Sequence, residues 1–261
     1  MAKRSDEGII LQLQKFSVND GEGIRTVIFL PGCPLRCKWC ANPEAWDLNA
    51  CIGGATASLT SLCEKTSVDK VMGQVERDAV FFRHSGGGVT FSGGEPTVQE
   101  GFLRNLVDEF YNRGISMWME TCGYFNFDEV KDILAKMEHV FYDIKCMDSG
   151  LHKKFTEVCN TLILENAVKL YVLGVPVTVR IPAIKNVNFK EENLTATAIF
   201  MQENLPGAKI EFLPYHNLAK EKYEKLNLTE RFHEFTAPCR QETAAAKALF
   251  KKYGIETVEY K

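Results

Sequence analysis

The sequence lacks a long apolar run. No stretch of its 261 residues approaches the length needed to span a bilayer. The first ten residues, MAKRSDEGII, carry charges where a signal peptide needs an apolar core. We therefore expect a protein that is not exported, has no membrane partner and is cytoplasmic.

A strong excess of one charge is also missing. The 31 basic and 34 acidic side chains leave a formal net charge of -3, which gives no overall attraction for nucleic acid. No low-complexity tract, internal repeat or Pro/Gly/Ser-rich linker divides the chain. We expect one globular domain over residues 1–261, a monomer, with no nucleic-acid partner.

Cysteine, by contrast, is present in an unusual pattern. The chain has nine cysteines, and Cys33, Cys37 and Cys40 lie within the single stretch GCPLRCKWC (32–40). An odd number with three so close together does not suit a disulfide framework. The pattern indicates a reducing compartment in which thiols are free to bind metal. Four others are scattered and are expected to be small buried apolar residues: Cys122, Cys146, Cys159 and Cys239.

Apolar, β-prone runs recur along the chain. They are IRTVIFL (24–30), GVTFS (88–92), ISMWMET (115–121), HVFYDIK (139–145), PVTVRIP (176–182) and KIEFLPYH (209–216). Segments with helical spacing separate them. Alternating strands and helices predict a parallel sheet in an α/β fold.

Helical periodicity is clearest in the first of these segments. One face carries Val68, Val71, Met72, Val75, Ala79 and Phe82. Thr97 and Glu100 predict a capping box that starts another helix at Thr97. Further helices are predicted over residues 128–138, 160–172, 191–203 and 240–252, the last ended by Gly254.

Polar residues fall at the ends of the predicted strands. In strand order they are the cysteine stretch, SGGE (92–95), Glu120 with Thr121, Asp143 with Lys145, Arg180, and Tyr215 with His216. An open doubly wound sheet and a barrel both fit the alternation. Chemistry at the carboxyl end of every strand is typical of barrels, so we favour a partial, TIM-like (β/α)6 barrel.

Three thiolates suit either zinc or an iron-sulfur cluster. A structural zinc site needs four protein ligands, and no second CxxC knuckle is present. A 4Fe-4S cluster normally takes four cysteines, so three leave one iron open to bind a substrate. We favour the cluster, with Cys33, Cys37 and Cys40 as its ligands.

The CxxxCxxC spacing, with Trp39 before the last cysteine, resembles the radical S-adenosylmethionine superfamily. Longer stretches resemble the activating enzymes of glycyl radical enzymes, typified by pyruvate formate-lyase activating enzyme. They run in order from about residue 8 to about residue 216 and are VNDGEGIRTVIFLPGCPLRCKWCANPEAW (18–46), FFRHSGGGVTFSGGEP (81–96), METCGYF (119–125), FYDIK (141–145) and IEFLPYH (210–216).

The resemblance implies a radical reaction. An external one-electron reductant such as flavodoxin would reduce the cluster, whose open iron binds S-adenosylmethionine. Reductive cleavage would give methionine and a 5'-deoxyadenosyl radical. That radical would abstract a Cα hydrogen from one glycine of a partner glycyl radical enzyme.

By resemblance, several residues would bind the cofactor. Gly93, Gly94 and Glu95 would hold its ammonium, Lys145 its carboxylate, and Asp143 its ribose or a cation. His216 would lie against the nucleoside, with Trp39 and Cys40 also in contact. The alternatives are a tight turn at SGGE, an ordinary ion pair between Asp143 and Lys145, and a core histidine.

The resemblance also implies a second ion site and a contact with the partner protein. Glu120 and Thr121, with Asp143, match a monovalent cation site. Asp20 and Arg180 match positions that meet the partner's glycyl loop. Their alternatives are a hairpin-turn aspartate and a buried ion pair.

The insert over residues 47–67 departs from the family pattern. Many relatives carry eight cysteines here for two further clusters, whereas this chain keeps only Cys51 and Cys63 in CIGGATASLTSLC. We predict a short loop without an auxiliary cluster, whose two thiols pair, bind metal weakly or have no role. Other departures are Ala41 in place of histidine, and Glu157 and Ala219 in place of glycines.

Two rival functions remain at this point. One is a radical S-adenosylmethionine enzyme that acts on a small molecule. The other is not an enzyme but a zinc-bearing interaction domain or an electron carrier.

Overall fold

The computed structural model describes residues 4–53 and 62–260. Its main sheet has seven strands in the order β2-β3-β5-β6-β7-β8-β9. They are β2 (Gln12–Ser17), β3 (Arg25–Leu30), β5 (Gly88–Gly93), β6 (Ser116–Thr121), β7 (His139–Asp143), β8 (Val177–Ala183) and β9 (Lys209–Pro214). β2 is antiparallel to β3, and the others are parallel. The six predicted runs are therefore confirmed as the parallel strands.

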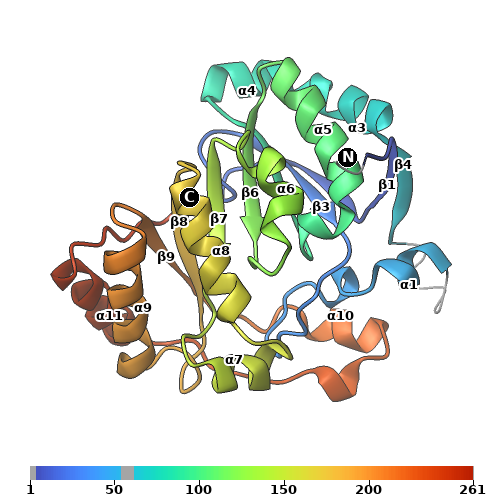
Figure 1. The fold of residues 1–261 in the computed structure, drawn as a ribbon. Coiled ribbons are helices and arrows are strands. Elements are labelled where there is room, and N and C mark those ends of the chain that lie inside the picture. Colours follow the sequence, from blue (N-terminus) through green and yellow to red (C-terminus); the bar gives the residue numbers. More distant parts are fainter. Residues whose placement is uncertain (1–3, 54–61, 261) are drawn as a thin grey trace.

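Helices connect the parallel strands and cover one face of the sheet (Figure 1). They include α5 (Glu100–Asn112), α6 (Phe127–Leu134), α8 (Thr161–Val172) and α9 (Glu191–Asn204). Within the described residues the edge strands β2 and β9 do not pair with each other, so the barrel stays open between them. The expected partial barrel is confirmed.

The two faces of the sheet differ in chemistry because neighbouring residues in a strand point to opposite sides. The helix-covered face is apolar and includes Phe91, Met119, Val140, Val179 and Ile210. The inner face is largely polar and includes Thr90, Ser92, Glu120, Arg180 and Glu211. The polar side chains of the sheet therefore gather on the inner side of the barrel.

Tyr260 closes the floor of the barrel at the amino ends of the strands. Its ring packs edge-on against Trp118 and Phe141, with centroids 5.7 and 4.9 Å away. Its backbone N–H donates to Glu211 Oε1 at 3.0 Å. The end of the chain is thus tied to an inner-face carboxylate.

Most predicted helices are present, with one wrong start. The first amphipathic face is split into α3 (Val68–Val75) and α4 (Ala79–Ser85) by the 3-10 turn η2 (Glu76–Asp78), and α11 (Arg240–Lys252) ends before Gly254. The capping box at Thr97 is wrong. A 3-10 turn, η3 (Pro96–Gln99), begins there, and its cap is Glu95, whose carboxylate accepts from Thr97 N at 3.2 Å.

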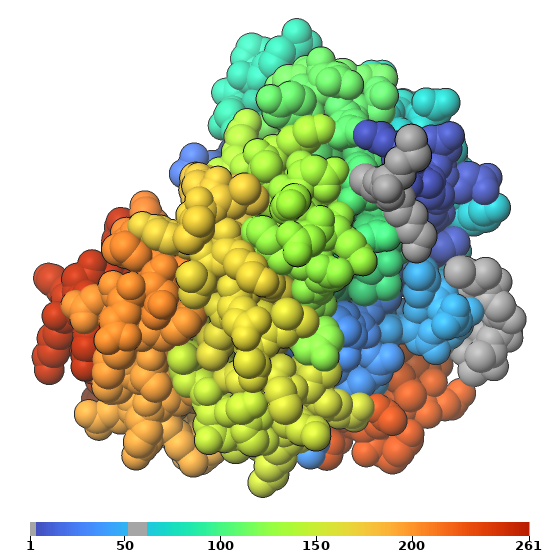
Figure 2. Space-filling view, in the orientation of Figure 1, coloured from blue at the N-terminus to red at the C-terminus, as the bar shows by residue number. Residues whose placement is uncertain are grey.

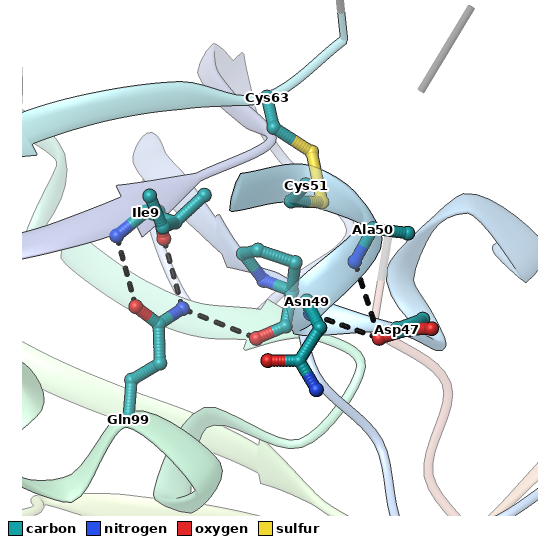
Figure 3. Close-up of a disulfide and its surroundings, with 8 residues drawn as sticks. Ile9, Asp47, Asn49, Ala50, Cys51, Cys63 and Gln99 are labelled. Carbon is teal, nitrogen blue, oxygen red and sulfur yellow. Dashed lines mark hydrogen bonds between the residues drawn. A yellow bond between two sulfur atoms is a disulfide. The ribbon is translucent and has the colours of Figure 1, made fainter. Parts of the chain in front are cut away.

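The described ends of the 47–67 insert are not a loop as predicted. They form α1 (Leu48–Gly53) and β4 (Glu64–Ser67), and β4 pairs antiparallel with β1 (Glu7–Ile10). Of the alternatives for Cys51 and Cys63, the structure has a disulfide, with the two Cα atoms 5.5 Å apart (Figure 3). Residues 54–61 of the predicted loop lie outside the described residues.

Besides α1, the periodicity did not reveal α7 (Ser149–Thr156) and α10 (Lys220–Lys225). Both lie at the carboxyl end of the sheet (Figure 1). Two short 3-10 turns, η1 (Pro43–Ala45) and η4 (Thr229–Arg231), lie in the connecting segments. Across residues 4–53 and 62–260, none of the helices has the length and apolar character needed to cross a membrane.

Glu157 caps α7 in the left-handed conformation, with φ at +71°. A side chain there costs about 1 kcal/mol relative to glycine. The Arg231 guanidinium lies 3.6 Å from the Glu157 carboxylate, but this ion pair adds little stability because both side chains are exposed. We expect Glu157→Gly to raise the free energy of unfolding by about 0.5–1 kcal/mol in urea denaturation. Gly207→Ala, at φ +85°, should lower it, and equal effects of both changes would contradict this account.

Candidate active site

A cavity of about 500 Å³ lies at the carboxyl ends of the parallel strands. Residues from the loop after β3, from the ends of β5 to β9 and from the β2–β3 turn line it. Among them are all but one of the predicted site residues: Asp20, Cys33, Cys37, Trp39, Cys40, Gly93, Gly94, Glu120, Thr121, Asp143, Lys145, Arg180 and His216. The exception is Glu95.

The cysteine loop is held at both ends by backbone hydrogen bonds. Gly32 N donates to Ala45 O at 2.8 Å, and Cys33 N donates to Trp46 O at 3.2 Å. In the middle of the loop, Arg36 N and Lys38 N donate to carbonyls at the carboxyl end of α7. These bonds fix three thiols at one wall of the cavity.

The three thiols differ in acidity. Burial raises the pKa of Cys40 to about 11 and that of Cys37 well above its usual value. The pKa of Cys33 is lowered, mainly because its sulfur accepts a hydrogen bond from the Cys122 thiol. Since metal binds the thiolate, Cys33 is the ligand that ionises most readily.

The donor set fits an iron-sulfur cluster. All three thiols face the same cavity, and Asn42 N donates to Cys40 Sγ at 3.4 Å. In the described ranges no group of three or more His, Cys, Asp or Glu side chains converges on one metal ion. A cluster does not require that convergence, because each cysteine binds a different iron.

Gly93 and Gly94 let two loops come into close contact. A Cβ on Gly93, whose φ is +119°, would lie 2.3 Å from Leu30 O. A Cβ on Gly94 would lie 2.3 Å from Gly32 O and 2.7 Å from Ala45 O. Glycine is therefore required here for the packing of backbone against the cysteine loop, whatever else it contacts.

Glu95 is completely buried and does not line the cavity. Oε1 accepts from Thr97 N and Oγ1 at 3.2 and 2.8 Å, and Oε2 accepts from Thr121 Oγ1 and Cys122 N at 2.7 and 2.8 Å. Four donors thus occupy this carboxylate, which ties the loop after β5 to the end of β6.

Arg180 lies between two carboxylates on the inner face. Its Nε donates to Glu211 Oε2 at 2.7 Å, and its NH1 group donates to Glu120 Oε1. The other oxygen of Glu120 accepts from Ser92 Oγ. Burial opposes the charge of Arg180, but the two carboxylates outweigh it and raise its pKa, while burial raises the pKa of Glu120.

Asp143 and Lys145 form an ion pair that faces the cavity. Burial alone would lower the pKa of Lys145, but the Asp143 carboxylate reverses this and raises it. His216 is exposed at the rim and is therefore not a core histidine. Trp39 is half-buried, with Phe155 and Phe235 at centroid distances of 5.8 and 6.0 Å.

Asp20 lies in the turn between β2 and β3. Its carboxylate accepts a hydrogen bond from Ser17 Oγ, and its carbonyl accepts from Thr90 Oγ1 at 2.7 Å. The turn thus reaches from the open edge of the barrel to the inner face. Asp20 is a turn aspartate and a cavity residue at once.

Comparison with known proteins identifies the family. A family model described as a 4Fe-4S single cluster domain matches residues 19–157. The isethionate sulfite-lyase activating enzyme of Nitratidesulfovibrio vulgaris is 35% identical, over 90% of this chain and 93% of that protein. The chain belongs to the glycyl radical enzyme activating enzymes. It is a radical S-adenosylmethionine enzyme with a 4Fe-4S cluster, so the expected activity and cofactors are confirmed.

Other activating enzymes are similar over nearly the whole chain. The trans-4-hydroxy-L-proline dehydratase activating enzyme of Clostridioides difficile is 30% identical, over 95% of this chain and 98% of that protein. The pyruvate formate-lyase 2-activating enzyme of Escherichia coli is 31% identical, over 97% and 93%. The alignment with the first of these spans 295 positions, more than the 261 residues of this chain. That relative therefore carries residues with no counterpart here.

Solved structures agree with the fold of this activating enzyme. A domain of pyruvate-formate lyase-activating enzyme from Bacteroides vulgatus is 28% identical, with a TM-score of 0.54, over 66% of this chain and 98% of that one. A radical SAM methyltransferase from Sphaerobacter thermophilus, 14% identical with a TM-score of 0.61, covers 95% of this chain and 76% of its own. The second likeness concerns the fold alone.

Sequence reasoning missed Cys122 in this activating enzyme. It was grouped with the scattered cysteines, yet it lines the cavity and donates to the Cys33 sulfur. Its position directly after Glu120 and Thr121, at a strand end, was the available signal. The expected burial is confirmed for Cys122 and Cys146 and is wrong for Cys159 and Cys239, which are exposed.

Glu95→Gln should destabilise the protein by about 3 kcal/mol, because an amide nitrogen cannot accept from the donors that surround the carboxylate. Urea unfolding of the cluster-free protein measures this. Glu165→Gln, on the exposed side of α8, should change stability by less than about 0.5 kcal/mol. Unchanged stability of Glu95→Gln together with weaker binding of S-adenosylmethionine would contradict a structural role.

Proposed function

We propose that this chain is a single-domain, single-cluster activase that generates a glycyl radical on a partner enzyme. One observation carries the proposal: the three thiols of the cysteine loop line a cavity whose other walls are the polar ends of six parallel strands. Cys33, Cys37 and Cys40 would hold the cluster, which would supply the electron for reductive cleavage of S-adenosylmethionine to methionine and a 5'-deoxyadenosyl radical. That radical would abstract a Cα hydrogen from a glycine of the partner.

The chain's own residues bind and orient the cofactor in this proposal. Lys145 pairs with its carboxylate, while Asp143 keeps that amine charged and contacts the ribose. The backbone at Gly93 and Gly94 lies against the methionine part. Trp39 and His216 contact the nucleoside. All of these residues line the cavity, which supports the assignment.

Glu95 takes a different part in the proposal from the one its motif indicates. Its carboxylate already accepts from four donors, so it acts by positioning Thr121 and Cys122 instead of holding the cofactor ammonium. A monovalent cation at Glu120, Thr121 and Asp143 stays in the proposal. The cation would share the Glu120 carboxylate with Arg180, whose guanidinium already forms an ion pair with that carboxylate.

The partner's glycyl loop enters through the open side of the barrel. The β2–β3 turn with Asp20 borders the cavity on one edge strand, and the end of β9 borders it on the other. Arg180 is held rigidly by two carboxylates behind this opening. The loop would therefore meet a preformed polar surface, which lowers the cost of positioning the glycine.

Further partners and location complete the proposal. Flavodoxin or a similar one-electron protein is the reductant, and the protein acts as a cytoplasmic monomer without nucleic acid. The similar activating enzymes serve several different glycyl radical enzymes. The proposal therefore names the class of partner and not one enzyme.

The decisive experiment is anaerobic. The cluster-loaded protein is mixed with dithionite and S-adenosylmethionine, and 5'-deoxyadenosine is measured beside Cys37→Ala. We expect product from the intact chain and at least about a hundredfold less from the variant, because the cluster loses one of its three ligands. No product from protein verified to contain its cluster would disprove the proposal.

The partner is tested separately by electron paramagnetic resonance. A purified glycyl radical enzyme incubated with the reduced protein and S-adenosylmethionine should acquire a glycyl radical signal. Cofactor cleavage without a signal on any glycyl radical enzyme offered would favour a small-molecule substrate.

Iron analysis tests the absence of an auxiliary cluster in the insert. Two cysteines cannot hold a four-iron cluster alone, so the reconstituted protein should contain about four irons per chain. Replacing Cys51 and Cys63 together by serine should leave that number unchanged. About eight irons, or a loss of iron in the double variant, would contradict the prediction.

A further inference from the structure

Helix α7 packs directly on the cysteine loop. Arg36 N donates to Thr156 O at 2.9 Å, and Lys38 N donates to Phe155 O at 3.0 Å. The last carbonyls of a helix have no partner within the helix, and the loop supplies these donors. The surface of α7 is thereby fixed relative to the three thiols.

This surface carries three positively charged side chains. Lys153 and Lys154 are exposed, and Lys38 is half-buried beside them. In the described part of the chain, none of the three amines has a carboxylate within ion-pair distance. The carboxylate of Glu157, which follows the helix, is paired with Arg231. The patch is positive although the whole chain has a net charge of -3.

Aromatic rings connect the charged surface to the cavity. Lys38 and Lys154 place their amines 5.5 and 5.6 Å from the centre of the Phe155 ring. Phe155 contacts Trp39, which lines the cavity with the cysteines. Only one layer of side chains therefore separates this surface from the thiol loop. We call Lys38, Lys153, Lys154 and Phe155 the α7 face.

Electron transfer between proteins slows steeply with distance, so a donor must dock where the cluster lies closest to the surface. In the described ranges no group of three or more His, Cys, Asp or Glu side chains forms a second metal site that could relay the electron. In the proposed function, the glycyl loop enters through the open side of the barrel between β2 and β9. The α7 face is next to the thiols, and its four residues are not among those that line the cavity. Figure 2 shows the α7 segment open to solvent at the lower edge of the molecule.

We propose that the α7 face is the docking surface for a small acidic one-electron carrier protein, an inference that rests on the proposed function. The carrier loses one electron and the cluster gains one, with no bond formed or broken and no proton transferred. Lysines are strongly hydrated point charges, suited to a brief, salt-sensitive encounter. A reductant that must leave before the radical reaction needs such a contact.

The test uses the cluster-loaded protein with Lys153→Glu and Lys154→Glu combined. The control is Lys251→Glu with Lys252→Glu, which makes the same charge change at the exposed end of α11, on another side of the molecule (Figure 1). Stopped-flow absorbance follows reduction of the cluster by reduced flavodoxin at low salt. Titration with oxidised flavodoxin measures affinity independently of any reaction.

We expect reduction by flavodoxin to slow about tenfold or more in the α7 variant and less than about twofold in the control. Affinity should fall in parallel. The difference in reduction rate between the α7 variant and the control should shrink at high salt, where charges are screened. Reduction by dithionite, a small molecule, should be equal in all three proteins and shows that the cluster itself is intact.

Equal slowing in both variants, or none in the α7 variant, would overturn the inference. So would an α7 variant that is reduced normally but fails to form a glycyl radical on its partner, because the face would then bind that partner. Normal reduction by flavodoxin without cleavage of S-adenosylmethionine would instead overturn the proposed function. The two failures are thus distinguishable.

Discussion

The site depends on one buried carboxylate. Glu95 accepts four hydrogen bonds, two from Thr97 and one each from Thr121 and Cys122. Its own N–H donates to Gly32 O at 2.7 Å. The cysteine loop, the loop after β5 and the end of β6 are therefore joined at one residue. A carboxylate suits this position because it offers several acceptor sites and no donor.

The sequence predicted the framework well because buried strands and helices leave periodic marks. The six apolar runs became the six parallel strands, and the polar residues at their ends gathered around one cavity. The cysteine spacing predicted the cluster because few other centres use three thiols so close together. These inferences depend on local patterns, which can be recognised without knowledge of tertiary contacts.

The fate of individual polar side chains was harder to predict. Glu95 was expected in the cavity, but two of its partners, Thr121 and Cys122, are distant in sequence, so no local pattern marks them. For the same reason the pairing of Arg180 with both Glu120 and Glu211 could not be chosen over contact with a partner protein. The prediction of a loop over the insert failed for another reason, because β4 is a strand through its pairing with β1, which lies outside the insert near the N-terminus.

The C-terminal segment is connected to the site by a chain of hydrogen bonds. Tyr260 donates to one oxygen of Glu211, the other oxygen accepts from Arg180, and Arg180 in turn holds Glu120 at the cavity. A fluctuation that breaks the hydrogen bond between Tyr260 and Glu211 would therefore weaken the restraint on Arg180 and Glu120 and make the cavity wall less rigid. The rate of amide hydrogen exchange at Tyr260 would therefore report how rigidly the residues of the cavity are held.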